Sequence, residues 1–371
     1  MHKIEVKLKQ NSYPIYTDFQ FRQLGLVMNS VFKRFKKPGQ ALFITHEHLW
    51  NMYGKQAAQS LKALKIKTHR TFLPPGEKTK SLANVEWLYH QCVKLKLDRT
   101  ACIIGLGGGV IGDIAGFVAA TYLRGVPLVH LPTTLLAMVD SSIGGKTGVD
   151  LPTAKNFVGA FYQPKFVGLD IRALASLPKT EFINGMAEVV KYGVIGDAQL
   201  FNTLVKNVRC LVENKNGILN QVIARCAEIK AEVVSKDEKE TRSLREILNF
   251  GHTWGHAIET ATGYEDYKHG EAVSLGMCAA GHMSVLDNIW PESNNMRMRE
   301  LLTQAGLPTQ LKKKLNPNLL LPILYHDKKT ERGTLRFVLP KAIGKVLVRP
   351  VSKALALEGL KVINHGPFSD H

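Results

Sequence analysis

The chain has 371 residues, and its composition of 45% hydrophobic and 22% charged residues excludes disordered and fibrous proteins. The formal net charge of +18 at pH 7 means that nucleic acid, acidic lipid and small anions must be weighed as partners. The two longest segments without a charged residue, 125–139 and 272–286, are shorter than the roughly 18 apolar residues that span a bilayer, so we expect no membrane partner.

The basic excess is concentrated in the first half, with +13 in residues 1–175 and +5 in residues 176–371. It is spread over separate segments such as 33–37 and 62–70, without the interleaved aromatic residues of a single-strand binder. We therefore expect a solvated basic surface and no nucleic-acid partner.

Two further features predict a cytoplasmic protein. The five cysteines are odd in number, widely spaced and never arranged as CxxC, which is typical of reduced thiols. The first six residues alternate polar and apolar side chains like a strand and lack the apolar core of a signal peptide.

The first half alternates short apolar runs with helical patterns. We predict strands at 41–45, 68–73 and 101–106, and helices at 49–64 and 81–95. This alternation is typical of βαβ units and of an α/β domain with a mostly parallel sheet.

After Leu177-Pro178 the pattern changes to long helices, predicted at 181–192, 199–213, 217–235 and 252–262. We place a domain boundary near residue 175. An α/β nucleotide-binding domain is expected over 1–175, and a mainly helical domain over 176–371.

A GxGxxG motif at Gly107, Gly109 and Gly112 follows the strand at 101–106 and opens a helix. Glycines there let backbone amides approach a pyrophosphate, whose charge the helix N-terminus favours. The acidic residue usual about 20 positions later is missing, so this is not an ordinary Rossmann fingerprint. A dinucleotide is favoured over the alternative of a plain strand-to-helix turn.

A second glycine-rich segment, 132–148, contains Gly-Gly-Lys-Thr, but Asp140 stands where a P-loop needs its first glycine. What remains is a polar loop suited to a phosphate or a hydroxylated ligand. Lys146, Lys155 and Asn156 offer two cations and an amide for one anion. The alternative is a surface turn.

The second half contains Glu188, His252, His256 and His269, residue types that bind zinc. His252 and His256 share a helix face, so both could bind one metal, or one could bind metal and the other substrate. Core and helix-capping histidines are an equally good explanation of the spacing alone.

Lys191, Arg245 and Asn249 are further polar residues at helical spacing. Lys191 follows Glu188 by three residues, which places both on one helix face. Arg245 and Asn249 are one turn apart, and the alternative for Arg245 is a surface ion pair with a neighbouring glutamate.

Taken in this order, the segments closely resemble the 3-dehydroquinate synthase family of sugar-phosphate cyclases, over roughly residues 40 to 350. The resemblance rests on Pro75-Gly-Glu-Lys-Thr-Lys80, the triple-glycine turn, Tyr122-Leu-Arg-Gly125, residues 132–147, Phe182-Ile-Asn-Gly-Met-Ala-Glu188, residues 249–256, His269-Gly-Glu-Ala-Val273 and Leu339-Pro-Lys-Ala-Ile-Gly344. Several ordered motifs are far more specific than any one of them.

The resemblance implies an enzyme that converts 3-deoxy-D-arabino-heptulosonate 7-phosphate to 3-dehydroquinate and phosphate in the shikimate pathway of aromatic amino acid biosynthesis. Members of the family use NAD and a divalent metal, usually Zn²⁺, with Co²⁺ as a substitute. Their order of steps is transient oxidation of a ring hydroxyl, phosphate elimination, reduction, ring opening and intramolecular aldol closure.

The resemblance also assigns residues. The metal ligands would be Glu188, His252 and His269, which leaves His256 to contact substrate or relay a proton. The substrate pocket would include Asp140, Lys146, Lys155, Asn156, Lys191, Lys230, Arg245 and Asn249, with Lys230 and Arg245 at the substrate carboxylate. The NAD contacts would be Glu77, Lys80, Gly108, Gly109, Asp113, Thr133, Thr134, Asp140, Lys146, Lys155 and Ser176. Arg124 would reach the phosphate across the interface of a homodimer.

The chain departs from the family pattern in several places. His46 and His48 stand where relatives often place acidic or amide residues against the adenosine. Ser176 replaces a threonine and keeps the hydroxyl. One extra residue falls between Glu240 and Arg245, which affects the assignment of Lys230. Near the C-terminal end of the resemblance, either Arg336 or Lys341 would supply a basic side chain that contacts the substrate.

Three other functions compete. A 2-deoxy-scyllo-inosose synthase would share NAD, metal and phosphate elimination, but Lys230 with Arg245 favours a carboxylated substrate. A metal-dependent polyol dehydrogenase would release reduced NAD. A nucleic-acid-binding protein rests on the net charge alone.

Overall fold

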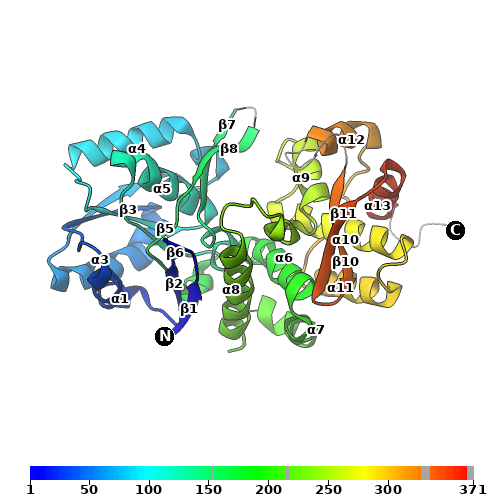
Figure 1. Cartoon of the computed structure of the whole chain (residues 1–371), viewed down its shortest axis with the longest axis horizontal. Coiled ribbons are helices and arrows are strands. Elements are labelled where there is room, and N and C mark those ends of the chain that lie inside the picture. The colour runs from blue at the N-terminus through cyan, green and yellow to red at the C-terminus, as the bar shows by residue number, and fades with distance from the viewer. Residues whose placement is uncertain (153, 214–216, 327–334, 366–371) are drawn as a thin grey trace. The chain divides into compact units, whose positions relative to one another are not determined.

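The computed structural model describes residues 1–152, 154–213, 217–326 and 335–365 (Figure 1). By internal contacts the chain forms two compact units. Unit 1 comprises Met1–Pro178 with Lys230–Lys239, and unit 2 comprises Lys179–Ile229 with Glu240–His371. Among the described residues no helix is long and apolar enough to cross a membrane.

Unit 1 is built on a seven-stranded sheet in the order β1-β2-β9-β6-β5-β3-β4, in which every pair except β1–β2 is parallel. The mostly parallel α/β sheet predicted from the sequence is confirmed. Its strands are β1 (His2–Val6), β2 (Tyr13–Thr17), β3 (Gln40–Thr45), β4 (Lys67–Phe72), β5 (Cys102–Gly107), β6 (Leu128–Pro132) and β9 (Phe166–Gly168).

Helices cover both faces of this sheet, so its central strands are apolar on both sides. In β3, Leu42 and Ile44 point to one face and pack in a core cluster with the buried residues of helices α4 and α5. Phe43, which lies between Leu42 and Ile44 in the strand, points to the other face and packs against Trp50. Figure 1 shows α4 and α5 on one side of the sheet and α1 and α3 on the other. The helices are α1 (Leu24–Val31), α2 (Glu47–Leu49), α3 (Lys55–Leu61), α4 (Leu82–Lys94) and α5 (Gly109–Thr121).

The glycine-rich segment after β6 is more ordered than the loop expected from its sequence. A π-helical turn, Ala137–Ser141, is followed by a tight turn at Gly144 and Gly145, both with positive φ. The antiparallel hairpin of β7 (Lys146–Leu151) and β8 (Ala154–Phe161) comes next. Lys146 therefore begins a strand. A π-turn inside a helix is rare and is frequent at functional sites.

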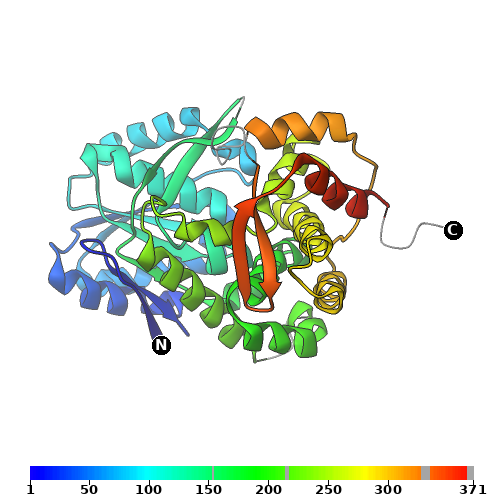
Figure 2. The ribbon, with the colours of Figure 1, turned by 45° about the vertical axis from the view of Figure 1, so that its right-hand side comes forward.

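Unit 2 is mainly helical, as predicted, with one antiparallel hairpin that the sequence pattern did not predict. Figure 2 brings this hairpin, β10 and β11, to the front. The elements are α6 (Lys179–Gly196), α7 (Ala198–Val212), α8 (Leu219–Lys236), α9 (His252–Ala261), α10 (His269–Leu286), α11 (Glu292–Gln304), α12 (Pro317–His326), β10 (Arg336–Ala342), β11 (Lys345–Pro350) and α13 (Lys353–His365). The last turns of α8 group with unit 1.

Helix α10 lies at the centre of unit 2 and is rich in small residues that allow close helix packing. A side chain at Gly276 would lie 1.8 Å from the carbonyl oxygen of Gly251, just before α9. One at Gly270 would lie 2.0 Å from the carbonyl oxygen of Asn184 on α6. These contacts bring the starts of α9 and α10 close to the middle of α6.

Candidate metal centre and ligand-binding residues

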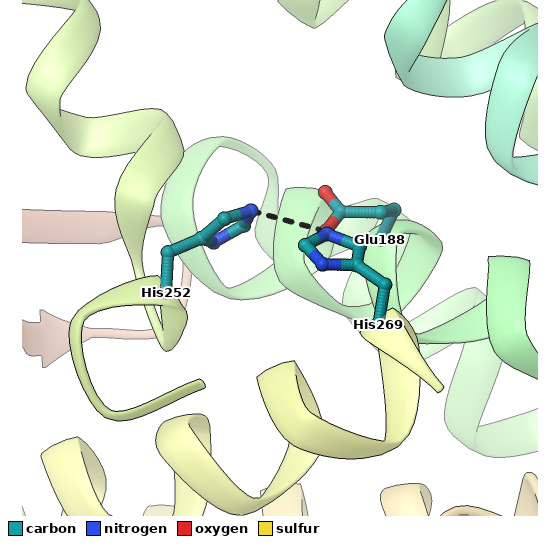
Figure 3. A group of neighbouring side chains, drawn as sticks. All are labelled: Glu188, His252 and His269. Atoms are coloured by element: carbon teal, nitrogen blue, oxygen red, sulfur yellow. Dashed lines mark ion pairs between the residues drawn. The ribbon is translucent and has the colours of Figure 1, made fainter. Parts of the chain in front are cut away.

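Glu188, His252 and His269 come together in unit 2 from three helices (Figure 3). Glu188 is on α6, and the two histidines are the first residues of α9 and α10. One turn before Glu188, the buried Asn184 accepts a 2.5 Å hydrogen bond from the N–H of Gly270. This bond fixes α6 against the start of α10.

The three side chains fit a metal ion. Glu188 Oε1 lies 3.5 Å from His252 Nε2 and 3.7 Å from His269 Nε2, near the separation of about 3.3 Å that donors of a tetrahedral zinc site have. Glu188 is fully buried, and among the described residues its oxygens make ion-pair contacts but accept no hydrogen bond. One carboxylate and two imidazoles leave a zinc coordination position open for substrate.

The histidines present the same nitrogen to this centre. His252 Nδ1 lies 3.1 Å from the carbonyl oxygen of Phe250, which can only accept a hydrogen bond, so Nδ1 carries the proton and Nε2 is the nitrogen that faces Glu188. In the metal-free chain burial lowers the pKa of His269, but the carboxylates of Glu188 and Glu259 outweigh burial and raise that pKa to about 10. A cation at the centre would replace this proton.

Lys191 and His256 lie beside the three candidate ligands. Lys191 is 1% exposed and forms an ion pair with Glu188, so the buried carboxylate is compensated. The ring of His256 lies 5.5 Å from that of His252 and 6.2 Å from that of His269, between centroids. His256 is therefore a neighbour of the two candidate histidine ligands.

Arg245 and Asn249 lie in a 3₁₀ segment, Leu244–Asn249, of unit 2. Arg245 is 2% exposed, and its Nε lies 3.3 Å from Glu240 Oε1. The glutamate compensates charge on the buried guanidinium. Arg336 makes a 3.3 Å ion pair with Glu246, next to Arg245, whereas Lys341 is exposed on β10.

In unit 1 the glycine motif forms the turn between β5 and α5. Gly107 ends the strand, and α5 begins at Gly109. A side chain at Gly108 would lie 2.9 Å from Thr134 Cγ2, so the turn packs directly on the segment after β6. Thr133 begins that segment, and its N–H donates to the carbonyl of Gly107 at 2.9 Å. Gly108, Gly109, Thr133 and Thr134 are thus neighbours at the carboxyl ends of parallel strands, where α/β sheets bind ligands.

Lys80 connects residues that the resemblance assigns to different ligands. Its amine is buried, lies 2.5 Å from Asp113 Oδ2 and donates to the side-chain oxygen of Asn156. Burial lowers the pKa of Lys80, but nearby carboxylates, Asp113 first, outweigh it and raise the pKa above its usual value. Glu77 Oε1 lies 4.0 Å away. Lys80 is therefore a cation that holds Asn156 beside the start of α5.

Lys230 and Asp140 form a second pair in unit 1. Lys230 Nζ donates to Asp140 Oδ1 at 2.6 Å and to its main-chain oxygen at 2.7 Å. Both acceptors belong to the π-helical turn Ala137–Ser141. Lys230 thus holds the Asp140 side chain and the turn that carries it.

Among the remaining assigned residues of unit 1, Lys155 is close enough to Glu77 to act on its carboxylate. Lys146 is exposed at the start of β7, and Lys155 is partly exposed on β8. Ser176 accepts a 2.8 Å hydrogen bond from the Tyr53 hydroxyl. Arg124 is exposed, with φ of 66°, after Leu123 with φ of 48°.

His46 and His48 line a hollow of about 570 Å³ beyond the carboxyl ends of β3 and β4. Their rings are stacked, with centroids 5.7 Å apart. His46 Nδ1 bonds the carbonyl of Leu73 at 2.8 Å, and burial lowers the His46 pKa, which favours the neutral ring. His46 therefore presents a neutral ring to the hollow at neutral pH.

Two acidic residues near these groups were not singled out from the sequence. Glu259 Oε1 lies 3.5 Å from His269 Nδ1. The sequence feature that could have indicated Glu259 is its spacing from His252 and His256, which places all three residues on one face of α9. Asp150 accepts a hydrogen bond from the backbone of Asn156. No spacing rule indicates Asp150, because a β-bulge brings the two residues together.

Comparisons with known proteins agree with this arrangement. The 3-dehydroquinate synthase N-terminal family matches residues 70–184, and the 3-dehydroquinate synthase C-terminal family matches residues 185–330. A 3-dehydroquinate synthase from Symbiobacterium thermophilum is 46% identical over 347 residues, which are 93% of this chain and 96% of that one.

Two solved structures are similar. The 2-epi-5-epi-valiolone synthase of Streptomyces hygroscopicus, with NAD⁺ and Zn²⁺ bound, has a TM-score of 0.86 at 26% identity and covers 96% of this chain and 98% of its own. A 2-deoxy-scyllo-inosose synthase complexed with carbaglucose-6-phosphate, NAD⁺ and Co²⁺ has a TM-score of 0.79 at 26% identity, over 97% and 99%. Since both family regions match in order and the identity reaches 46% over nearly the full length, the chain belongs to the 3-dehydroquinate synthase family.

Proposed function

We propose that this chain converts 3-deoxy-D-arabino-heptulosonate 7-phosphate to 3-dehydroquinate and phosphate, with NAD and Zn²⁺ or Co²⁺ as cofactors, as a 3-dehydroquinate synthase. The observation that carries the proposal is the buried group of Glu188, His252 and His269, in which one carboxylate oxygen faces both Nε2 atoms. The fit of these donors to zinc supports a metal-dependent reaction.

NAD bound by unit 1 supplies reversible hydride acceptance, and the metal supplies Lewis-acid polarisation of a substrate hydroxyl. Glu77, Lys80, Asp113 and the turn at Gly108 and Gly109 would hold the dinucleotide. The backbone amides of that turn, at the start of α5, favour its pyrophosphate.

The phosphate of the substrate would be held by Lys146, Asn156 and Arg124. Two cations and an amide stabilise the charge that grows on the phosphate as it leaves. Lys80 donates to the Asn156 oxygen and so orients the amide nitrogen away from its own amine. The leaving phosphate can accept the proton from the adjacent carbon.

The carboxylate of the substrate would be bound by Arg245. Its guanidinium is buried beside Glu240, and the planar fork of a guanidinium matches the geometry of a carboxylate. Lys230 is assigned to the same carboxylate by the family pattern, but its amine bonds Asp140. We therefore assign Lys230 the role of placing Asp140.

The assembly is proposed to be a cytoplasmic homodimer in which Arg124 reaches the partner's phosphate site. The exposure of Arg124 and its constrained backbone support this role. The free thiols of the five cysteines fit a reducing compartment.

The test is release of phosphate from the heptulosonate phosphate, measured with and without chelator and NAD. Release that needs both cofactors supports the proposal. Turnover of glucose 6-phosphate in its place would favour an inosose synthase, and net accumulation of NADH would favour a polyol dehydrogenase.

A further inference from the structure

Glu259 is a buried acidic residue for which the proposed reaction has no role. It lies on α9 seven residues after His252 and three after His256, so all three share one helix face. The residue is 7% exposed. A buried carboxylate destabilises a fold unless a partner compensates it. The groups facing Glu259 therefore indicate what it does.

His269 faces Glu259 with the nitrogen that the metal centre does not use. Glu259 Oε1 lies 3.5 Å from His269 Nδ1, whereas Glu188 Oε1 lies 3.7 Å from His269 Nε2. One imidazole thus stands between two carboxylates, with a different ring nitrogen toward each. A carboxylate at Nδ1 favours the tautomer whose Nδ1 carries the proton and whose Nε2 can bind a cation.

His252 has the same arrangement with a different acceptor. Its Nε2 also faces Glu188, and its Nδ1 lies 3.1 Å from the carbonyl oxygen of Phe250. Both histidines are therefore supported at Nδ1 by an acceptor. The acceptor at His269 is a carboxylate, which makes Nε2 of His269 a more basic ligand.

We propose that Glu259 is a positioning residue of the metal centre: its carboxylate accepts the Nδ1–H of His269, orients the ring toward Glu188 and strengthens metal binding at Nε2. The proposal rests on the proposed metal-dependent function. It assigns Glu259 no contact with substrate or metal.

Glu259 and His269 could also bind a cation directly, at a position different from the one proposed. His256, Glu259 and His269 also offer three ligand atoms within 4.8 Å of one another. A cation there would take His269 Nδ1. Two cations at once would require His269 to lose both ring protons. A single ion at Nε2, supported by Glu259, needs no such ionisation.

The experiment measures Zn²⁺ affinity of the metal-free full chain by competition with a chelator, and the number of ions bound. Glu259→Gln keeps the size of the side chain and removes its charge. We expect one ion per chain and an affinity about 10- to 100-fold lower than wild type. Glu259→Asp, which keeps the charge one methylene further back, should lose less.

Glu228→Gln is the matched control. Glu228 is a half-buried carboxylate of unit 2 that pairs with Arg225 at 3.0 Å. Its neutralisation should leave zinc affinity unchanged. A Co²⁺-loaded sample of Glu259→Gln should also show a shifted absorption spectrum, because the donor strength of His269 changes.

A purely structural role predicts the opposite pattern. If Glu259→Gln lowers only the unfolding temperature of the metal-free chain, and the folded protein keeps wild-type affinity, the proposal is wrong. It is equally wrong if wild type binds two ions and Glu259→Gln binds one at full affinity. Should Glu259→Gln not fold, Glu259→Asp is the deciding variant: its carboxylate is drawn back from His269 Nδ1, so it should still bind zinc more weakly than wild type. Wild-type affinity in Glu259→Asp together with an unshifted Co²⁺ spectrum overturns the proposal. Wild type that binds no zinc, or binds it equally well as His252→Ala, contradicts the proposed function instead.

Discussion

The main-chain N–H of Asn156 donates a 2.8 Å hydrogen bond to Asp150 Oδ1 on the neighbouring strand. The register of β7 and β8 shifts at this point, and Asn156 has φ of 57°. A bulge of this kind re-aims a side chain, and here the Asn156 amide reaches Lys80. The carboxylate of Asp150 stabilises the backbone conformation that makes this possible.

Asp150→Ala should therefore reduce kcat/KM by about 10- to 100-fold, because a small misplacement of a binding group has effects of this size. Asp150→Asn keeps an acceptor oxygen and should lose less. Steady-state kinetics check both, with Asp98→Asn, an exposed turn residue that bonds Thr100, as the control. Equal kinetics for Asp150→Ala and wild type would exclude the positioning role.

The proposed metal centre predicts different outcomes for its two histidines, His252 and His269, and for the neighbouring His256. His252→Ala and His269→Ala should lose metal and activity together, since each removes a ligand. His256→Ala should retain most of its metal and lose activity. Metal analysis of the purified variants checks this, and a His256→Ala protein as empty as His252→Ala would show that His256 is a ligand.

The cofactor prediction concerns the amount of NAD that is needed. The hydride is taken from the substrate and returned to it, so a trace of NAD should support many turnovers. Product is measured at a fixed enzyme concentration and increasing NAD. Product limited to the amount of NAD added would contradict a redox-neutral reaction.

His130 predicts a contribution to stability that depends on pH. It is 4% exposed on β6, and burial lowers its pKa from 6.5 to about 4. Below pH 6.5 the unfolded chain binds a proton that the folded chain excludes, so stability falls as pH decreases. Between pH 7 and 4 this residue alone should cost about 3 kcal/mol.

Chemical unfolding of wild type and His130→Gln at pH 7, 5.5 and 4 measures this contribution. The variant lacks the titrating group and should lose less stability on acidification. Parallel losses in both proteins would show that His130 is protonated when folded.

Residues that share one helix or one turn could be predicted from the sequence, because their spacing fixes their geometry. Glycines 107–109 are of this kind, and so are His252 and His256. The strand periodicity of β3, β4 and β5 also predicted the parallel sheet. Local spacing therefore indicates which side chains share an element, and the family motifs indicated which elements meet.

Pairs that depend on tertiary packing were not predictable. Lys230 and Asp140 are 90 residues apart, and Lys80 and Asn156 are 76 apart, so neither pair has a signal in spacing. The hairpin of β10 and β11 was missed because it follows a long helical region, although its strands of seven and six residues are as long as those predicted in unit 1. Glu259 had a signal, its place on the face of α9, but a single glutamate on a helix is usually solvated.

The last prediction concerns Arg124 and the proposed dimer. Leu123 and Arg124 have φ of 48° and 66°, and Gly125 has φ of 116°, so three consecutive residues adopt a conformation that disfavours side chains. Such backbone strain persists where structure or function requires it. Arg124 is exposed, and among the described residues none holds its guanidinium by a hydrogen bond or ion pair.

If Arg124 completes the partner's phosphate site, Arg124→Ala and Lys146→Ala should each be inactive alone yet complement each other when mixed. A mixed dimer has one site with both lesions and one with neither, so random exchange should restore up to about a quarter of wild-type activity. Phosphate release after confirmed subunit exchange measures this, and no gain in activity would show that Arg124 does not act across an interface.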